Sequence, residues 1–208
     1  GIQPSEDPIK AIVALCETKL AGWLAEMDEC DSWSTLLEQA ASKVGTCFEI
    51  VKNDEDLQRV KARFVKDGER AFANLEAELS DEVFGVTFRL QNRKFAWQQP
   101  FVSIIDTRGD KIARSYFTKW HEIAHLLTLT SQRRLVFKRT HSAEDKQDPE
   151  ERLMDIIAGR LGFFGPIFHR SIDAHISFEQ IEKLRLELCP EASMQASLIS
   201  FSLNWPTP

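Results

Sequence analysis

The sequence predicts an α+β fold: a mainly helical single domain in which a small β-sheet packs beside one long, apolar helix. Apolar residues recur at helical spacing through most of the chain, whereas segments 82–90 and 101–106 (EVFGVTFRL and FVSIID) are rich in Val, Ile and Phe, as strands are. A length of 208 residues, with 43% hydrophobic and 28% charged residues, suits one globular domain. We therefore expect one domain over 1–208, with 1–31 as an N-terminal helical extension.

The first part of the chain predicts helices around a single short strand. Residues 8–28 have a helical apolar pattern, and Pro8 stands near its start, where a missing N–H costs nothing. Residues 31–45 begin with the polar stretch DSWS and end in a glycine, which indicates a short helix. A strand is expected at 47–51 (CFEIV). The stretch 53–80 opens with NDED and predicts one long, highly charged helix whose charges form a solvated face.

After the two central strands the pattern returns to helices. In order, we expect a loop or extra hairpin strand at 91–100, a helix at 112–130, a strand or extended segment at 134–140, a polar loop at 141–148, a helix at 149–164 ended by GFFGP, and two final helices at 177–188 and 191–203.

Charge and cysteine content narrow the class of protein. A protein with a formal net charge of -6 is repelled by the phosphate backbone of nucleic acids, so no direct nucleic-acid binding is expected. No apolar run approaches the length of a membrane-spanning helix. The N-terminal stretch GIQPSEDPIK lacks the order of a signal peptide, so we expect a cytoplasmic protein. The widely spaced Cys16, Cys30, Cys47 and Cys189 are then expected to be reduced and mostly buried.

The most informative motif is HEIAH at residues 121–125. His121 and His125 are four residues apart, so on a helix both imidazoles can reach one metal ion. Glu122 can approach a water on that ion without being a ligand itself. This is the HExxH arrangement of zinc hydrolases. The alternative is a chance pair of core histidines, and with five histidines in the chain a random HExxH has a probability on the order of one per cent.

A catalytic zinc usually has three protein ligands, and the stretch DPEERLMDIIAGRL at 148–161 offers the third. Glu151 and Asp155 share one face of the predicted helix, so Glu151 can bind the ion while Asp155 braces a ligating imidazole. Two alternatives stay open. Glu151 could complete a capping box at the helix start. Glu150 could be the ligand instead, but Met154 stands four residues after it and cannot brace an imidazole.

Two stretches carry a family resemblance. YFTKWHEIAHLL at 116–127 and EERLMDIIAGRL at 150–161 resemble the metal helix and the later ligand helix of the ImmA/IrrE family of zinc-dependent regulatory peptidases. The chain departs from that family where Met154 and Asp155 replace Ala-Asn and Ile157 replaces Phe. Asp155 is more similar to the residue that thermolysin-like enzymes have at this position than to the usual Asn of the family. Weaker similarity extends over roughly residues 32–204. The resemblance implies a zincin-like fold and one Zn²⁺ per chain.

The motif also defines a mechanism. Zinc lowers the pKa of its bound water, and Glu122 takes the proton as general base and returns it to the leaving amine. The candidates for an oxyanion donor are His141 and Tyr116, although Tyr116 points off the motif's face and His141, like His169 and His175, reads more simply as a surface imidazole. An extended substrate is expected along the edge of strand 101–106. The basic residues nearby could attract an acidic partner or simply be solvated: Arg133, Arg134, Lys138 and Arg139.

The resemblance implies cleavage of a helix-turn-helix transcriptional repressor during stress or induction. One alternative is a zinc-peptidase fold that binds a partner with little or no cleavage, but Glu122 argues against it because holding a metal needs only ligands. Another is a zinc hydrolase with a small substrate. The sequence indicates no oligomeric state.

Overall fold

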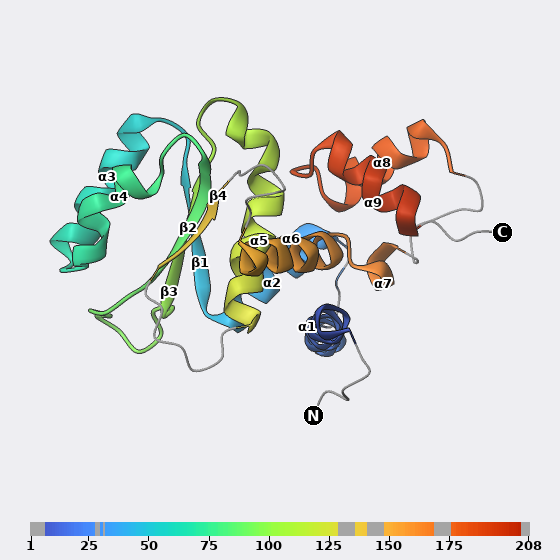
Figure 1. Cartoon of the computed structure of the whole chain (residues 1–208), viewed down its shortest axis with the longest axis horizontal. Helices are drawn as coiled ribbons and strands as arrows, with labels where there is room; N and C mark the ends of the chain where they lie inside the picture. Colours follow the sequence, from blue (N-terminus) through green and yellow to red (C-terminus); the bar gives the residue numbers. More distant parts are fainter. Residues whose placement is uncertain are drawn as a thin grey trace.

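A four-stranded sheet in the order β1-β3-β2-β4 forms the centre of the fold (Figure 1). The computed structural model describes residues 7–27, 30, 32–128, 136–140, 148–168 and 176–204, with the backbone alone at 136–140, 168, 203 and 204. The strands are β1 (Thr46–Val51), β2 (Val83–Arg89), β3 (Phe101–Asp106) and β4 (Val136–Thr140). Strand β1 is parallel to β3, whereas β2 is antiparallel to both β3 and β4.

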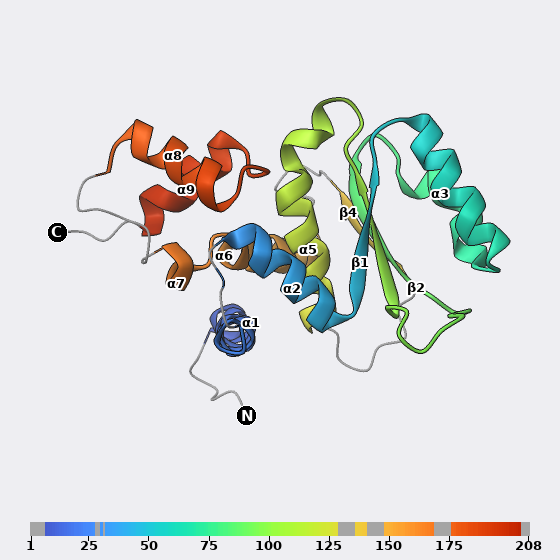
Figure 2. The same ribbon diagram turned by 180° about the vertical axis from the view of Figure 1, so that it is seen from behind.

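Helices cover both faces of this sheet (Figures 1 and 2). One face carries α3 (Asp54–Lys66), the 3₁₀ turn η1 (Arg70–Asn74) and α4 (Leu75–Glu78). The other carries α5 (Ser115–Thr128), which follows the 3₁₀ turn η2 (Gly109–Arg114). Beyond α5 lie α1 (Pro8–Ala25), α2 (Trp33–Val44), α6 (Pro149–Gly162), α7 (Gly165–Phe168), α8 (Phe178–Leu188) and α9 (Met194–Asn204). The predicted α+β class is therefore confirmed, and the helix beside the sheet is the one that carries HExxH.

Local sequence signals set several helix boundaries as expected. Helix α1 begins at Pro8, and α2 is capped at its end by Gly45, whose φ of 80° is a left-handed conformation that glycine adopts easily. The Asp148 side chain accepts a hydrogen bond of 2.9 Å from the Glu150 N–H and so caps α6, which starts at Pro149. In the part of the chain described, no helix is long and apolar enough to cross a bilayer.

Two sequence expectations are wrong. Residues 53–80 do not form one helix: α3 ends at Lys66, and Gly68 at a φ of 88° turns the chain so that Phe72 and Leu75 reach the core. Strand β3 is not an edge, because it lies between β1 and β2. Strand order depends on pairing between distant segments, which the residues of one strand do not specify. The edges among the described strands are β1 and β4.

The two faces of the sheet differ in chemistry. Toward α3 and α4 the strands present an apolar surface, in which Val86, Phe88 and Ile104 are buried against helix residues such as Phe72. Because side chains alternate along a strand, the intervening residues face α5. They include small and polar residues of three strands: Thr46, Gly85, Thr87 and Ser103.

Helix α1 contributes residues to the main core. Its Val13, Cys16 and Leu20 are buried in the same cluster as residues of α5 and α6. The Lys19 ammonium donates a hydrogen bond of 3.2 Å to the carbonyl of Leu127, at the end of α5. The four cysteines are free thiols; Cys16 and Cys189 are buried, Cys30 is half-buried and Cys47 is exposed.

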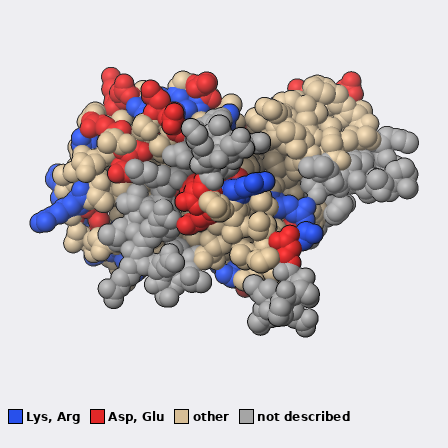
Figure 3. Space-filling view, in the orientation of Figure 1, with Lys and Arg blue, Asp and Glu red and all other residues tan. Residues whose placement is uncertain are grey.

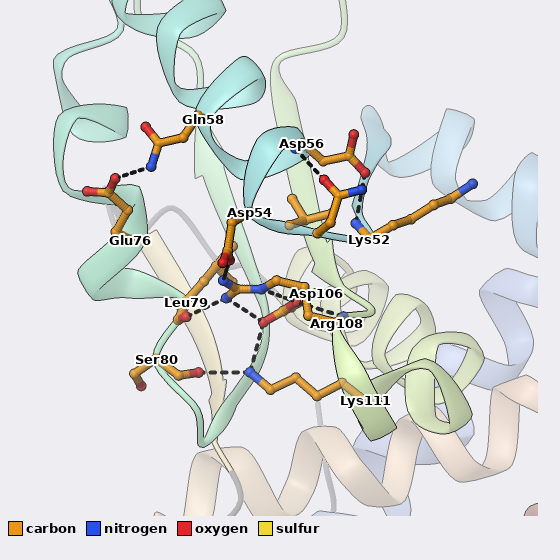
Figure 4. Close-up of polar contacts among 12 residues, drawn as sticks. Lys52, Asp54, Asp56, Gln58, Glu76, Leu79, Ser80, Asp106, Arg108 and Lys111 are labelled. Atoms are coloured by element: carbon orange, nitrogen blue, oxygen red, sulfur yellow. Dashed lines mark hydrogen bonds and ion pairs between the residues drawn. The ribbon is translucent and has the colours of Figure 1, made fainter.

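A buried cluster of charges fixes the connection from β3 to α5 (Figure 4). The Asp106 side chain is 0% exposed and accepts hydrogen bonds of 2.9 Å from Arg108 Nε and 2.8 Å from Lys111 Nζ. Lys111 Nζ also donates to the carbonyls of Ser80 and Val83, at 2.9 Å each. The cluster therefore ties η2 to the start of β2, the strand that faces α5.

Candidate metal centre

Helices α5 and α6 cross beside the sheet and bring the residues of both motifs together (Figures 1 and 2). Helix α5 is buried along most of its length, with Trp120 and Ile123 directed into the main core. Its polar residues are buried as well: His121 and Glu122 are 0% exposed and His125 is 2% exposed. Buried imidazoles and a carboxylate require polar partners, and α6 supplies some of them.

Three ligand atoms converge at this crossing. Both oxygens of Glu151 face imidazoles: Oε2 lies 3.1 Å from His121 Nε2, and Oε1 lies 3.3 Å from His125 Nε2. The two Nε2 atoms are 3.2 Å apart. Tetrahedral ligands about 2.0–2.1 Å from a zinc ion would be separated by about 3.3 Å. The described residues contain this one group of three with the spacing to hold a metal ion.

Asp155 makes the contact expected of a bracing carboxylate. Its Oδ1 lies 2.8 Å from His121 Nδ1. An imidazole that donates its Nδ1–H to this carboxylate keeps a lone pair on Nε2, which is the atom directed at the other two ligands. A second carboxylate approaches the other imidazole, because Glu150 Oε1 lies 3.8 Å from His125 Nδ1. That distance is too long for a hydrogen bond, so Glu150 acts on the His125 imidazole through its negative charge.

The charge state of Glu151 suits a ligand. Burial opposes its ionisation, but the neighbouring imidazoles of His121 and His125 outweigh this effect and lower the pKa of Glu151 to about 2. The carboxylate is thus an anion at neutral pH. Its side chain is 12% exposed, against 48% for Glu150. Both Glu151 oxygens are directed at the imidazoles, an arrangement open to a metal ligand.

Glu122 occupies a separate buried pocket against β2. Its Oε2 accepts a hydrogen bond of 2.6 Å from Thr87 Oγ1, whereas Oε1 is buried and has no hydrogen-bond partner among the residues that the structure describes. A buried carboxylate oxygen without a partner is costly, so this atom fits a site where a further polar molecule binds. Burial raises the pKa of Glu122, and His125, His121 and Thr87 offset this only in part.

The acidic side of the site reaches the surface where α6 begins. Figure 3 shows acidic side chains in the middle of the face drawn, over the crossing of α5 and α6. Glu150 and Asp155 supply exposed carboxylate there, with 48% and 33% of their side chains exposed. These exposed carboxylates beside the three ligand atoms favour the approach of a cation.

The other candidate residues lie elsewhere. The Tyr116 hydroxyl is buried and donates to the carbonyl of Gly162. Gly162 lies eleven residues after Glu151 on α6, roughly 16 Å along the helix axis. Tyr116 thus belongs to the core and not to the metal centre. His141, His169, His175, Arg133 and Arg134 lie outside the described residues, and Lys138 and Arg139 are on β4, where the structure describes the backbone alone.

Sequence reasoning missed two residues that contact Glu122. Thr87 donates to its carboxylate, and Gly85 leaves room for it. Alternation along β2 places both on one face, but only the strand order shows that this face meets α5. Comparison of the chain with protein-family models and with curated proteins finds no match.

Proposed function

We propose that this chain is a zinc-dependent endopeptidase in which His121, His125 and Glu151 bind one Zn²⁺ and Glu122 is the general base. The observation that carries the proposal is the pairing of two features. Three ligand atoms lie at the spacing of a tetrahedral ion, and the carboxylate next to the first ligand keeps one buried oxygen that no described residue contacts by a hydrogen bond. A site that only held a metal would need the first feature alone.

The chemistry divides between the ion and Glu122. When bound, Zn²⁺ supplies Lewis acidity, which lowers the pKa of water and polarises a carbonyl. Glu122 Oε1 accepts a proton from the attacking water and returns it to the leaving amine, while Oε2 stays hydrogen-bonded to Thr87. The raised pKa of Glu122 suits a group that must hold and then release a proton.

The substrate we propose is a helix-turn-helix transcriptional repressor, cleaved in a stress or induction response. This part rests on the resemblance to the ImmA/IrrE family carried by the two motifs. An extended peptide needs a free strand edge beside the metal helix. Strand β4 meets this need better than β3, because β4 is an edge among the described strands and contacts α5.

The test compares the wild-type chain with Glu122→Gln on a helix-turn-helix repressor, with cleavage resolved on gels and zinc measured in each sample. Gln keeps the shape of Glu but cannot accept the proton. We expect the variant to fold and bind zinc as the wild type does, but to cleave at least 10²- to 10⁴-fold more slowly. The matched control is Glu182→Gln, at an exposed position on α8. Wild-type cleavage by Glu122→Gln would overturn the mechanism, and an inactive wild-type protein would favour the binding module.

A further inference from the structure

Part of the sheet face under α5 is polar although it is buried. Thr87 and Ser103 are 0% exposed and Thr46 is 3% exposed. A sheet covered on both faces normally presents apolar side chains on both, as this one does toward α3. Burying hydroxyls is unfavourable unless each finds a partner, so three adjacent hydroxyls on three strands call for a physical reason.

These hydroxyls form one chain that ends on Glu122. Thr46 Oγ1 lies 2.9 Å from Ser103 Oγ, and Ser103 Oγ lies 2.6 Å from Thr87 Oγ1. Thr87 Oγ1 in turn lies 2.6 Å from Glu122 Oε2. Thr87 and Ser103 stand directly opposite each other on β2 and β3, so the strand register builds this contact.

The direction of the chain follows from the number of protons. A hydroxyl has one proton to donate, and an ionised carboxylate can only accept. Thr87 therefore donates its hydrogen bond to Glu122 and must accept one from Ser103. Ser103 must in turn accept one from Thr46. Thr87 and Ser103 each both donate and accept, and this arrangement strengthens the bond that reaches the carboxylate.

Gly85 completes the pocket on the same face of β2. A Cβ at this position would lie 3.0 Å from Glu122 Oε1 and 2.6 Å from the Thr118 methyl group. Strand β2 thus donates to one oxygen of Glu122 through Thr87 and lets the other approach its backbone closely at Gly85. The two oxygens of the carboxylate become inequivalent.

We propose that Thr87 is a positioning residue for Glu122, held in its donating orientation by Ser103 and Thr46. It fixes Oε2 as an acceptor and thereby selects Oε1 as the oxygen that takes the proton from water. The inference rests on the proposed function, because it assigns a role within that reaction. Thr87 touches neither substrate nor metal ligand in this role and acts through Glu122 alone.

The kinetic test compares Thr87→Val, which keeps the shape of the side chain and removes the hydroxyl, with Thr87→Ser, which keeps the hydroxyl. We expect Thr87→Val to lower kcat roughly ten- to 100-fold with KM and zinc content unchanged, and Thr87→Ser to restore most of the rate. Ser103→Ala should give a smaller loss because Thr87 keeps its proton for Glu122. Wild-type kcat in Thr87→Val, or equal losses in the Val and Ser variants, would overturn the role.

A second measurement needs no substrate. In a double-mutant cycle on melting temperature, at matched metal content, Thr87→Val should lower the midpoint by roughly 2–10 °C in the wild-type background, because it leaves a buried charged oxygen without its donor. In the Glu122→Gln background the loss should be at most about half as large. Additive losses would show that Thr87 does not hold Glu122. If the wild type cleaves no substrate, the proposed function fails, and the cycle still decides whether the contact exists.

Discussion

His121 Nδ1 and Asp155 Oδ1 lie 2.8 Å apart, and this contact joins the two helices that carry all three proposed metal ligands. It fixes the rotation of the His121 ring and directs Nε2 toward Glu151 and His125. The ligand group therefore depends on the crossing of α5 and α6 and not on the HExxH helix alone. Residues that set this crossing should affect zinc binding even when they are not ligands.

Asp155→Asn tests this dependence. An amide can still accept from Nδ1–H, but it lacks the charge that makes the imidazole a stronger base. We expect zinc affinity to fall roughly ten- to 100-fold. Competition with a chromogenic chelator measures it. Asp148→Asn is the control, since Asn caps a helix about as well as Asp; equal affinities in both variants would contradict the bracing role.

Glu151→Ala and Glu150→Ala separate the two neighbouring carboxylates. Glu151 contacts both Nε2 atoms, so its removal should abolish stoichiometric zinc binding, as should His121→Ala or His125→Ala. Glu150 lies 3.8 Å from His125 Nδ1, and its removal should leave the stoichiometry intact. Elemental analysis and melting curves on the same samples give the answer. A Glu151→Ala variant that keeps its zinc and loses only about 1 kcal/mol of stability would support the capping interpretation instead.

Structural features that depend on a few neighbouring residues could be predicted from the sequence. Pro8, Gly45 and the Asp148-Pro149 pair each mark a helix boundary through a local backbone preference, and the structure has those boundaries. Spacing on a helix likewise predicted that His121 and His125 share a face. The prediction of one long helix over 53–80 was wrong for a local reason too. A single glycine is tolerated within a helical pattern, so Gly68 did not by itself indicate a helix end, whereas in the structure the chain turns there and Phe72 is buried in the core.

Strand order and side-chain contacts across the sheet could not be predicted in the same way. The sequence of β3 is compatible with an edge or a central strand, and only its pairing with β1 and β2 decides between them. Thr87 looks like an ordinary strand residue, and its role depends on Ser103 opposite and Glu122 above. These contacts join residues 16 and 35 positions apart in sequence, beyond the reach of any periodicity.

The buried Asp106 should make stability depend on pH. Burial alone would raise the pKa of Asp106, but hydrogen bonds from Arg108 and Lys111 outweigh it and lower the pKa below its ordinary value of 3.8. A lowered pKa in the folded state means that these bonds stabilise the protein above that value. The contribution is lost as the pH falls below 3.8 through the folded-state pKa.

Asp106→Asn should therefore be destabilised by on the order of 3 kcal/mol at neutral pH, because two cations lose their buried partner. The difference from wild type should shrink below about pH 4. Urea denaturation from pH 3 to pH 7 measures both effects. Asp67→Asn breaks an exposed pair with Lys94 and should change stability by at most about 1 kcal/mol. A difference between wild type and Asp106→Asn that does not vary with pH would rule out the ion pairs as its origin.

Gly85→Ala tests whether β2 and α5 approach as closely as the Glu122 pocket requires. The added Cβ would lie 2.6 Å from the Thr118 methyl group, which is closer than real contacts allow, and 3.0 Å from Glu122 Oε1. Thr118 is held by a hydrogen bond of 2.9 Å from its hydroxyl to the Arg114 carbonyl, so either the strand or the helix must move. We expect a loss of about 1–3 kcal/mol in stability from overpacking, together with a fall in kcat because Oε1 is displaced.

Gly22→Ala is the matched control for Gly85→Ala. It lies inside α1 with nothing within 4 Å of its added Cβ, and Ala there should stabilise the helix by about 0.5–1 kcal/mol. Urea denaturation of both variants, with cleavage assayed alongside, separates the outcomes. If Gly85→Ala were as stable and as active as Gly22→Ala, β2 would not be confining the Glu122 carboxylate, and the pocket would have to be formed by α5 and α6 alone.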